Sequence, residues 1–303
     1  MTLKDEDRPP IHGWRMQAIE WLERDEYAAA RLGEDIAFTV AYSEQSCNPG
    51  MSEVERAWGG GGLSWVGGPA GGGAGEPWPR RHDGRPLAHV ATFDLADARG
   101  VIGDDTRTEW PGDQEGLPEV GVLEVFHDCE TFGHDPAEAD HGAWHVRWVP
   151  APDRSALDAG PADRDNASDA CQAMLAFGTF SVRSADDFLG ARSAELAAAE
   201  AANDQIQRMW SWQRTLVKAA GPRPITHLYG HSQHGDQWPM RACLPHCIPL
   251  AAAGDRYRLI AEIESSTSLA GWFGDAGSLE VWMRASDLEA RAFDQAWCLI
   301  RDA

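Results

Sequence analysis

A short sequence pattern occurs twice in the chain. Residues 90–94 (Val-Ala-Thr-Phe-Asp) precede residues 121–126, and residues 260–264 (Ile-Ala-Glu-Ile-Glu) precede residues 277–282. In each case the second run has the form Gly-x-Leu-Glu-Val-aromatic. Because one sheet unit must cover its apolar face with another, the pattern predicts two pseudo-repeated halves around a shared interior, not two independent domains.

Hydrophobic periodicity predicts the elements around this pattern. Strands are expected at residues 35–42, 87–93, 120–126, 144–149, 176–182, 256–263 and 278–283. Helices are expected at residues 11–33, at residues 193–220 and from Ser286 onward, where a capping-box sequence precedes an inner face of Leu288, Phe293, Trp297 and Ile300. We predict an α+β fold with N-terminal, central and C-terminal helices, in which residues 1–58 pack as a helix and strand on one main domain, residues 59–303.

Residues 59–75 are rich in glycine. They lack the Lys-Ser/Thr ending of a phosphate-binding loop, and they do not connect a strand to a helix as a dinucleotide-binding turn does. The segment is therefore predicted to be a mobile or tightly turning surface loop.

The charge balance excludes several classes of partner. With 26 basic and 48 acidic residues the formal net charge is −22, which repels phosphate backbones and anionic lipid, so neither nucleic acid nor membrane is expected as a partner. The N-terminus has no basic-then-apolar signal sequence and no apolar run is long enough to span a bilayer, so a cytoplasmic protein is expected. Its six cysteines are expected to be reduced thiols.

The segment Trp272-Phe-Gly-Asp275-Ala-Gly277 has two interpretations. As a turn between strands, its glycines supply positive φ and Asp275 accepts backbone hydrogen bonds. As a ligand pocket, Trp272 would stack on the ligand and Asp275 would accept hydrogen bonds from it. The turn is the commoner use of such a sequence.

A second cluster contains His227, His231, His234 and Asp236. The His231-x-x-His234 spacing could present two imidazoles to one metal ion, with Asp236 as a third ligand or as an orienting partner. Short His pairs in polar loops are more commonly solvated, and no HExxH sequence on a helix accompanies this one.

A cysteine pair and a group of four histidines each have a functional and a structural interpretation. Cys243 and Cys247 flank His246 and could bind zinc with His231 and His234, although two buried thiols beside a proline turn is the ordinary interpretation. Four histidines in an acidic stretch could be acid–base groups, but solvated loop histidines are expected there: His127, His134, His141 and His145.

Six segments resemble one known family: residues 64–69 (Ser-Trp-Val-Gly-Gly-Pro), 77–79 (Pro-Trp-Pro), 86–95, 117–126, 227–233 and 271–282. From about Ser64 to Ala303 the chain is similar to the YwqG-like family, a bacterial family of unknown function. The similarity departs from the family pattern at His231 and Ser232, and Thr92 and Glu262 stand where the family usually has glutamine. The resemblance implies coiled antiparallel sheets and no known reaction. Family members lie near genes for secreted toxins, which implies an immunity or partner-binding role.

These observations lead to one principal function and two alternatives. The principal one is a non-enzymatic cytoplasmic binding protein without a cofactor, whose acidic surface attracts a basic protein partner. The first alternative is a metal-dependent hydrolase or small-ligand protein, with ligand-binding candidates Trp272, Asp275, His227, His231, Gln233 and Glu262 and metal ligands His231, His234 and Asp236. The second is a module whose tryptophan-lined cleft holds a sugar or peptide.

Overall fold

The structure is a computed structural model that describes residues 36–44, 51–72, 76–101, 116–164, 170–182, 187, 226–265, 269, 271–274 and 277–301. Its strands are β1 (Ile36–Glu44), β2 (Ser64–Gly67), β3 (Ala88–Asp94), β4 (Val122–His127), β5 (Trp144–Val149), β6 (Cys171–Val182), β7 (His227–Leu228), β8 (Tyr257–Glu264), β9 (Ser278–Arg284) and β10 (Trp297–Arg301). Its helices are short: α3 (Met51–Trp58), α4 (Leu95–Gly100), α7 (Leu244–Cys247), α8 (Ala285–Glu289), the 3₁₀ helices η2 (Pro136–His141) and η6 (Phe293–Gln295), and the π-helix η5 (Pro239–Cys243).

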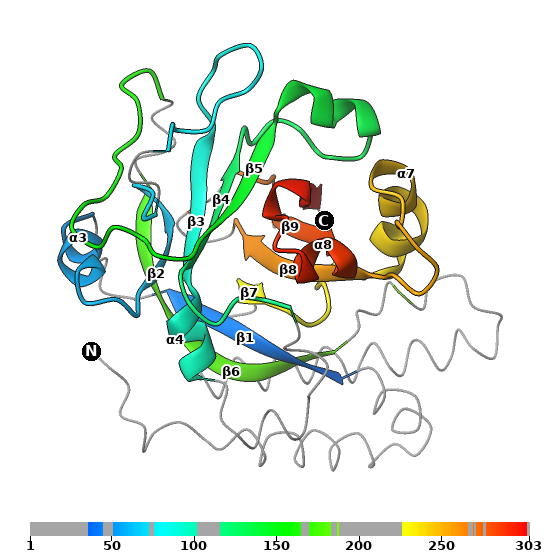
Figure 1. Ribbon diagram of the computed structural model, residues 1–303, viewed down its shortest axis with the longest axis horizontal. Helices are drawn as coiled ribbons and strands as arrows, with labels where there is room; N and C mark the ends of the chain where they lie inside the picture. Colours follow the sequence, from blue (N-terminus) through cyan, green and yellow to red (C-terminus); the bar gives the residue numbers. More distant parts are fainter. Residues whose placement is uncertain are drawn as a thin grey trace.

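The ten strands of the described residues form one sheet in the order β10-β9-β8-β7-β1-β6-β2-β3-β4-β5, and Figure 1 labels β1 to β9. Every pairing is antiparallel, and β1 is an internal strand between β6 and β7. The predicted antiparallel sheet is therefore confirmed. The described part is mainly β, so the α+β class is not.

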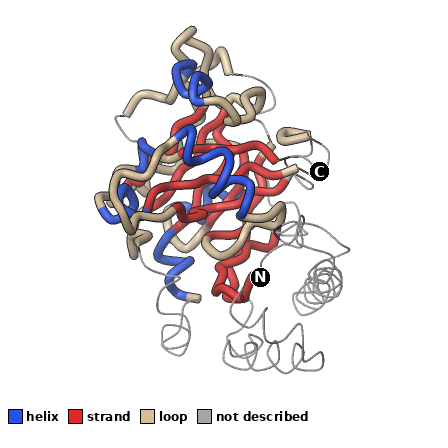
Figure 2. The backbone as a smooth tube through the Cα atoms, turned by 90° about the vertical axis from the view of Figure 1, so that its right-hand side faces the viewer, coloured by secondary structure: helices blue, strands red, loops and turns tan. Residues whose placement is uncertain are grey.

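The strands, red in Figure 2, curve around the interior of the molecule. The two outer strands, β5 and β10, come close together through their tryptophans. The rings of Trp144 on β5 and Trp297 on β10 lie 4.7 Å apart, edge to face. The Trp144 indole N–H donates to the carbonyl of Ala296 at 3.1 Å. The sheet thus nearly closes on itself around the main hydrophobic core.

The strands carry apolar residues on the face toward this core, and both buried polar residues and smaller apolar clusters on the other face. Leu279 and Val281 of β9 belong to the core, whereas Glu280 between them is buried on the opposite face. Leu123 and Val125 of β4 enclose Glu124 in the same alternation. The candidate functional groups therefore lie on the face of the sheet away from the main core.

Two sets of four strands flank β1 and β6, and we name them the first region (β2 to β5, residues 64–149) and the second region (β7 to β10, residues 227–301). The register aligns one row of residues across each region, Trp65-Thr92-Glu124-Arg147 in the first and His227-Glu262-Glu280-Leu299 in the second. The register also shifts once in each, between His89 and Ala91 and between Leu259 and Ala261.

The C-terminal helix predicted from Ser286 is wrong in its extent. Helix α8 ends at Glu289, and residues 297–301 form β10, whose Trp297 and Ile300 pair with β9. Ser286 does not cap a helix, because its hydroxyl donates to Asp255 at 2.7 Å. An apolar run beside an open strand edge gains a full set of backbone hydrogen bonds by joining the sheet. The predicted helices at residues 11–33 and 193–220 lie outside the described residues.

The surface-loop prediction for the glycine-rich segment is also wrong over residues 64–72. Strand β2 lies inside the sheet, and Ala70, Gly71 and Gly72 are buried. A Cβ atom on Gly71 would lie 2.7 Å from the rings of Trp58 and Trp65. The glycines here allow close packing of backbone against aromatic rings.

In the described part of the chain no helix is long and apolar enough to cross a membrane.

Candidate functional site

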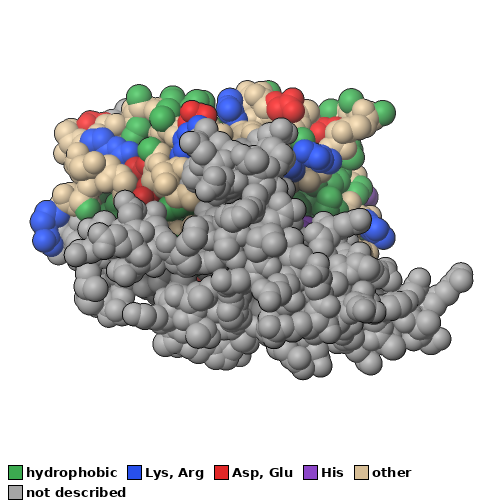
Figure 3. Space-filling view, turned by 90° about the horizontal axis from the view of Figure 1, so that it is seen from below, with side chains coloured by type: hydrophobic (Ala, Val, Ile, Leu, Met, Phe, Trp, Pro, Cys, Tyr) green, Lys and Arg blue, Asp and Glu red, His purple; other side chains and the backbone are tan. Residues whose placement is uncertain are grey.

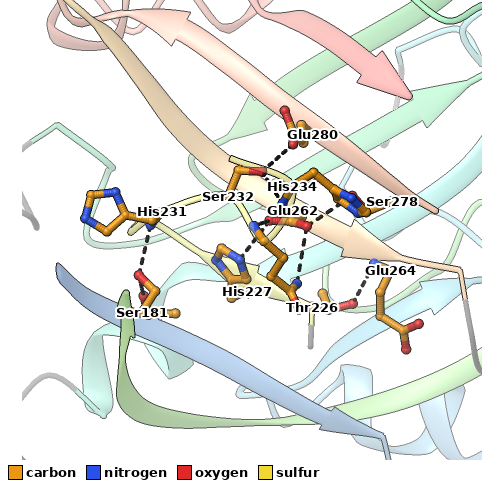
Figure 4. A network of polar contacts seen from close by, with 12 residues as sticks. Ser181, Thr226, His227, His231, Ser232, His234, Glu262, Glu264, Ser278 and Glu280 are labelled. Carbon is orange, nitrogen blue, oxygen red and sulfur yellow. Dashed lines mark hydrogen bonds and ion pairs between the residues drawn. The ribbon is translucent and has the colours of Figure 1, made fainter. Parts of the chain in front are cut away.

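The centre of the candidate site is a buried His–Glu pair (Figure 4). The two-residue strand β7 places His227 directly across from Glu262 of β8, with Nε2 3.1 Å from a carboxylate oxygen. Nδ1 of His227 lies 2.8 Å from the carbonyl oxygen of Tyr229, which fixes the ring. Burial opposes ionisation of Glu262, but hydrogen bonding to His227 and the charges of His227 and His234 lower its pKa below the ordinary value.

Glu262 also anchors the loop that follows β7. Its carboxylate accepts the backbone N–H of Gln233 at 2.9 Å, the Gln233 side-chain amide at 3.2 Å and the Ser278 hydroxyl at 3.1 Å. The sequence candidates His227, Gln233 and Glu262 are thus brought together. A carboxylate with this many donors is stabilised inside the protein.

A second buried carboxyl, Glu280, lies beside Glu262 in the register of β8 and β9. The Ser232 hydroxyl is 2.5 Å and the Trp282 indole nitrogen 2.7 Å from its oxygens, and Arg301 approaches to 3.4 Å. Burial raises the pKa of Glu280 to about 8, because desolvation outweighs the opposing charge of Arg301. Folding therefore favours the protonated form of Glu280 and the ionised form of Glu262.

Residues 229–236 cover the pair of glutamates. Tyr229 and Gly230 both have positive φ, and a Cβ atom on Gly230 would lie 2.2 Å from the Ser181 and Thr39 hydroxyl oxygens, so the turn requires glycine there. Asp236 accepts the backbone N–H of Ser232 at 2.9 Å and lies 2.5 Å from Nδ1 of His231. The Asp236 carboxylate therefore holds residues 231 and 232 of this loop in place.

The metal-site candidates do not form a donor set in the structure. Asp236 is hydrogen-bonded to His231, and in the described part of the chain no group of three His, Cys, Asp or Glu side chains is arranged to hold a metal ion. Cys243 and Cys247 have sulfur atoms 3.8 Å apart, and His246 between them is exposed. Burial raises the pKa of the Cys243 thiol to about 12.

The 272–277 segment lies between β8 and β9, as the turn interpretation predicts. Trp272 is half-buried and packs against the main core, and Gly271 and Gly274 have positive φ. A Cβ atom on Gly277 would lie 1.9 Å from the Phe273 carbonyl oxygen, so this glycine permits close backbone approach. Asp275 lies outside the described residues.

Sequence reasoning missed the corresponding polar group of the first region. Glu124 accepts the backbone N–H groups of Gly71 and Gly72 at 2.5 and 2.9 Å, and Arg147 Nε donates to it at 2.7 Å. The Gly-x-Leu-Glu-Val pattern, present at both places, is the signal that could have identified Glu124 and Glu280 as a matched pair.

The prediction that His127 is a solvated loop residue is wrong. It is buried at the end of β4, its ring is stacked on Trp144 at 6.0 Å, and its Nδ1 accepts the backbone N–H of Cys129. Burial lowers the pKa of His127 to about 4, against the opposing charge of Asp128. His127 is therefore neutral at pH 7.

Comparison with known proteins adds a family but no activity. No curated protein matches the chain. A family model described as "Domain of unknown function (DUF1963)" matches residues 64–301, which begin at β2 and end with β10. That match takes in both polar rows and the loops that cover them, and the chain therefore belongs to the DUF1963 family.

Proposed function

We propose that the chain is a non-enzymatic binding protein of the YwqG-like type, whose partner is a basic protein. The observation that carries the proposal is the net charge of −22 on 303 residues. Such a charge attracts a basic partner over distances comparable to the screening length and raises the association rate. A cytoplasmic location and the absence of a cofactor belong to the same proposal.

The closed hydrogen bonding of the site supports binding without catalysis. The Glu262 carboxylate is surrounded by His227, Gln233 and Ser278, and Glu280 by Ser232, Trp282 and Arg301. A ligand would have to displace these internal donors before it reached either carboxyl. We therefore assign the network to holding residues 229–236 in place, in preference to the small-ligand alternative.

We also infer that the two regions are pseudo-repeats. The inference is supported by the shared row positions, by the shift of register in each β-pair, and by the paired positive-φ residues Gly67-Gly68 and Tyr229-Gly230 that end β2 and β7. In each region a buried glutamate of the second long strand anchors the segment after this turn.

Figure 3 draws one face of the molecule. On the described part of that face, blue Lys and Arg side chains are scattered among acidic and hydrophobic ones.

The test is a measurement of association rate against ionic strength. The protein is used to capture partners from native lysate at low salt, and a partner identified by mass spectrometry is then purified. We expect a basic protein whose association rate falls about tenfold or more between 20 and 500 mM salt, with a smaller change in dissociation rate. A neutral or acidic partner, or a rate independent of salt, would contradict the proposal.

A further inference from the structure

Two cysteines lie side by side in the helical segment between β7 and β8. Cys243 is the last residue of η5 and Cys247 is the last residue of α7, and their sulfur atoms are 3.8 Å apart. Both are free thiols, so this distance is a contact and not a bond. To form a disulfide bond of about 2.05 Å, the two sulfur atoms must approach each other by roughly 1.8 Å.

The two thiols differ in their access to solvent. Cys243 is buried, whereas Cys247 is only partly buried. The backbone leaves the helix directly after Cys247, at Ile248, and residues 249–254 are exposed. A reagent in solution therefore meets Cys247 first, with Cys243 behind it. An accessible thiol backed by a second thiol is the arrangement of a redox-active pair.

The helical spacing would make a bond between these sulfur atoms strained. Residues four apart on a helix have Cβ atoms about 5–6 Å apart, but a disulfide needs about 3.5–4.5 Å. The helix is already irregular here, because the Leu244 N–H donates to the Pro239 carbonyl five residues back. Oxidation must therefore pull the end of α7 inward. A strained and accessible disulfide is also easily reduced, as regulatory disulfides are.

Both thiols contact the connection between β4 and β5. Cys243 Sγ lies 3.6 Å and Cys247 Sγ 3.9 Å from the carbonyl oxygen of Gly133. The same oxygen accepts the indole N–H of Trp297 on β10 at 2.7 Å. Figure 1 shows α7 beside the green helix η2 of this connection. The thiol pair is thus one carbonyl group away from the strand that closes the sheet.

Two more contacts join these parts of the molecule to β10. The carbonyl of Phe132 accepts the backbone N–H of Ile300 at 3.0 Å. The guanidinium of Arg301 lies 4.9 Å from the ring centroid of Trp238, the residue before η5. A shift of α7 therefore reaches β10 both through residues 132–133 and through the start of η5.

We propose that Cys243 and Cys247 are a modification site at which a small-molecule disulfide forms a reversible disulfide bond, and that this bond loosens β10. The Cys247 thiolate attacks one sulfur of the oxidant, which breaks the S–S bond of the oxidant and releases one thiolate. The Cys243 thiolate then attacks the Cys247 sulfur and releases the second thiolate. Two electrons pass to the oxidant, and its two released thiolates take up the two protons that the protein thiols lose. The site is independent of the partner proposed above.

Burial slows this reaction at neutral pH. It raises the pKa of the Cys243 thiol to about 12 and also raises the pKa of the Cys247 thiol. Because only the thiolate attacks a disulfide, exchange becomes faster as the pH rises. The experiment is therefore run at about pH 8, where more of each thiol is ionised than at neutral pH.

The experiment treats the full chain with oxidised glutathione and follows one tryptic peptide until its mass no longer changes. Trypsin cleaves after Arg241 and Arg256, so residues 242–256 carry both cysteines. After free thiols are alkylated, we expect this peptide to carry no alkyl group and to be two hydrogen atoms lighter than the reduced peptide. An excess of reduced glutathione should restore two thiols that can be alkylated.

Single variants test the order of the two steps. Cys243→Ser should retain one glutathione on Cys247, because no second thiol displaces it. Cys247→Ser should react at least about tenfold more slowly, because Cys243 is buried. Cys129→Ser is the matched control, since Cys129 is partly buried as Cys247 is, and it should leave the disulfide unchanged. Circular dichroism verifies that each variant is folded.

Hydrogen–deuterium exchange tests the effect on β10. In the oxidised wild type we expect the amides of residues 297–301 to exchange at least about threefold faster than in the reduced protein. Treated Cys247→Ser should show no such change. Glutathione retained on the wild type, or a wild-type peptide alkylated on both cysteines, would overturn the disulfide. A disulfide with unchanged exchange in residues 297–301 would overturn its effect on β10.

Discussion

The two regions place a glutamate at the same point of the sheet and surround it differently. In the first region Glu124 has Thr92 beside it on β3 and Arg147 directly across on β5, at 2.7 Å. In the second region Glu280 has another carboxylate, Glu262, beside it and Leu299 across.

This difference decides which species is buried. In the first region the Arg147 guanidinium forms a buried ion pair with Glu124. Two carboxyls side by side cannot both be ionised without cost, so burial and the neighbouring Glu262 raise the pKa of Glu280, whereas hydrogen bonding to His227 lowers the pKa of Glu262. The same backbone position can thus bury either an ion pair or a neutral acid.

The largest effect is expected from removing the cation of the first region. Arg147→Met leaves Glu124 buried without its ion-pair partner and should lower the free energy of unfolding by about 3–5 kcal/mol. Arg301→Met should cost less, about 1–2 kcal/mol, because Arg301 lies 3.4 Å from Glu280 and its shortest hydrogen bond, at 2.7 Å, is to the carbonyl of His234. Urea unfolding at pH 7 measures the free energy lost in each variant. Equal losses would show that Glu124 and Glu280 do not differ in their dependence on an arginine.

The next effect separates the two glutamates of the second region. Glu262→Gln replaces an oxygen acceptor by an N–H donor among His227, Gln233 and Ser278, and should cost about 2–3 kcal/mol. Glu280→Gln is uncharged in both the folded and the unfolded chain, so it avoids the cost of protonating Glu280 at pH 7 and should leave the free energy of unfolding unchanged or raise it. The reverse order in denaturant unfolding would mean that the proton sits on Glu262.

The third prediction concerns alkaline pH. Because the pKa of Glu280 is raised from 4.5 to about 8 on folding, the unfolded chain binds fewer protons between these values. The contribution of Glu280 to the free energy of unfolding is fully present below pH 4.5. It is lost as pH rises toward 8, at about 1.4 kcal/mol per pH unit. The stability difference between wild type and Glu280→Gln should change with this slope, and parallel curves would contradict it.

The fourth prediction concerns acid and the first region. The pKa of His127 is lowered from 6.5 to about 4, so the unfolded chain binds more protons between these values. The contribution of His127 is present above pH 6.5 and is lost as pH falls through 4, with a similar slope over a narrower range. The free energies of unfolding of the wild type and of His127→Gln, measured from pH 7 to pH 4, should therefore converge as the pH falls.

The smallest effect is expected at the surface. Trp238→Ser and Leu250→Ser should each change the free energy of unfolding by no more than about 0.5 kcal/mol, because both side chains are substantially exposed. Thermal melting checks this. A large loss at Trp238 would indicate that it stabilises the closure of the sheet through Arg301.

The strands were predictable where their side chains alternate or form apolar runs. Strand β5 matches the alternating prediction, and β8 and β9 match within a residue or two. Strand β10 was missed because Trp297-Cys-Leu-Ile fits a helix face as well as a strand, and only the free edge of β9 decides between them. The glycine-rich segment was misread because Glu124, which pairs with its amides, lies more than 50 residues away.

Residue types at the site were predictable, but their pairing was not. His227 and Glu262 were both candidates, yet their contact depends on β7, which has only two residues and no periodicity of its own. The proton on Glu280 depends on burial and on a neighbouring strand, neither of which a local pattern contains.

The contact between Trp144 and Trp297 has a consequence for synthesis of the protein. The ribosome makes β5 well before β10. Until β10 emerges, the edge of β9 that pairs with it stays open, and Trp144 on β5 lacks its partner Trp297. Nascent chains stalled before β10 should therefore be caught by chaperones or self-associate along the open edge of β9.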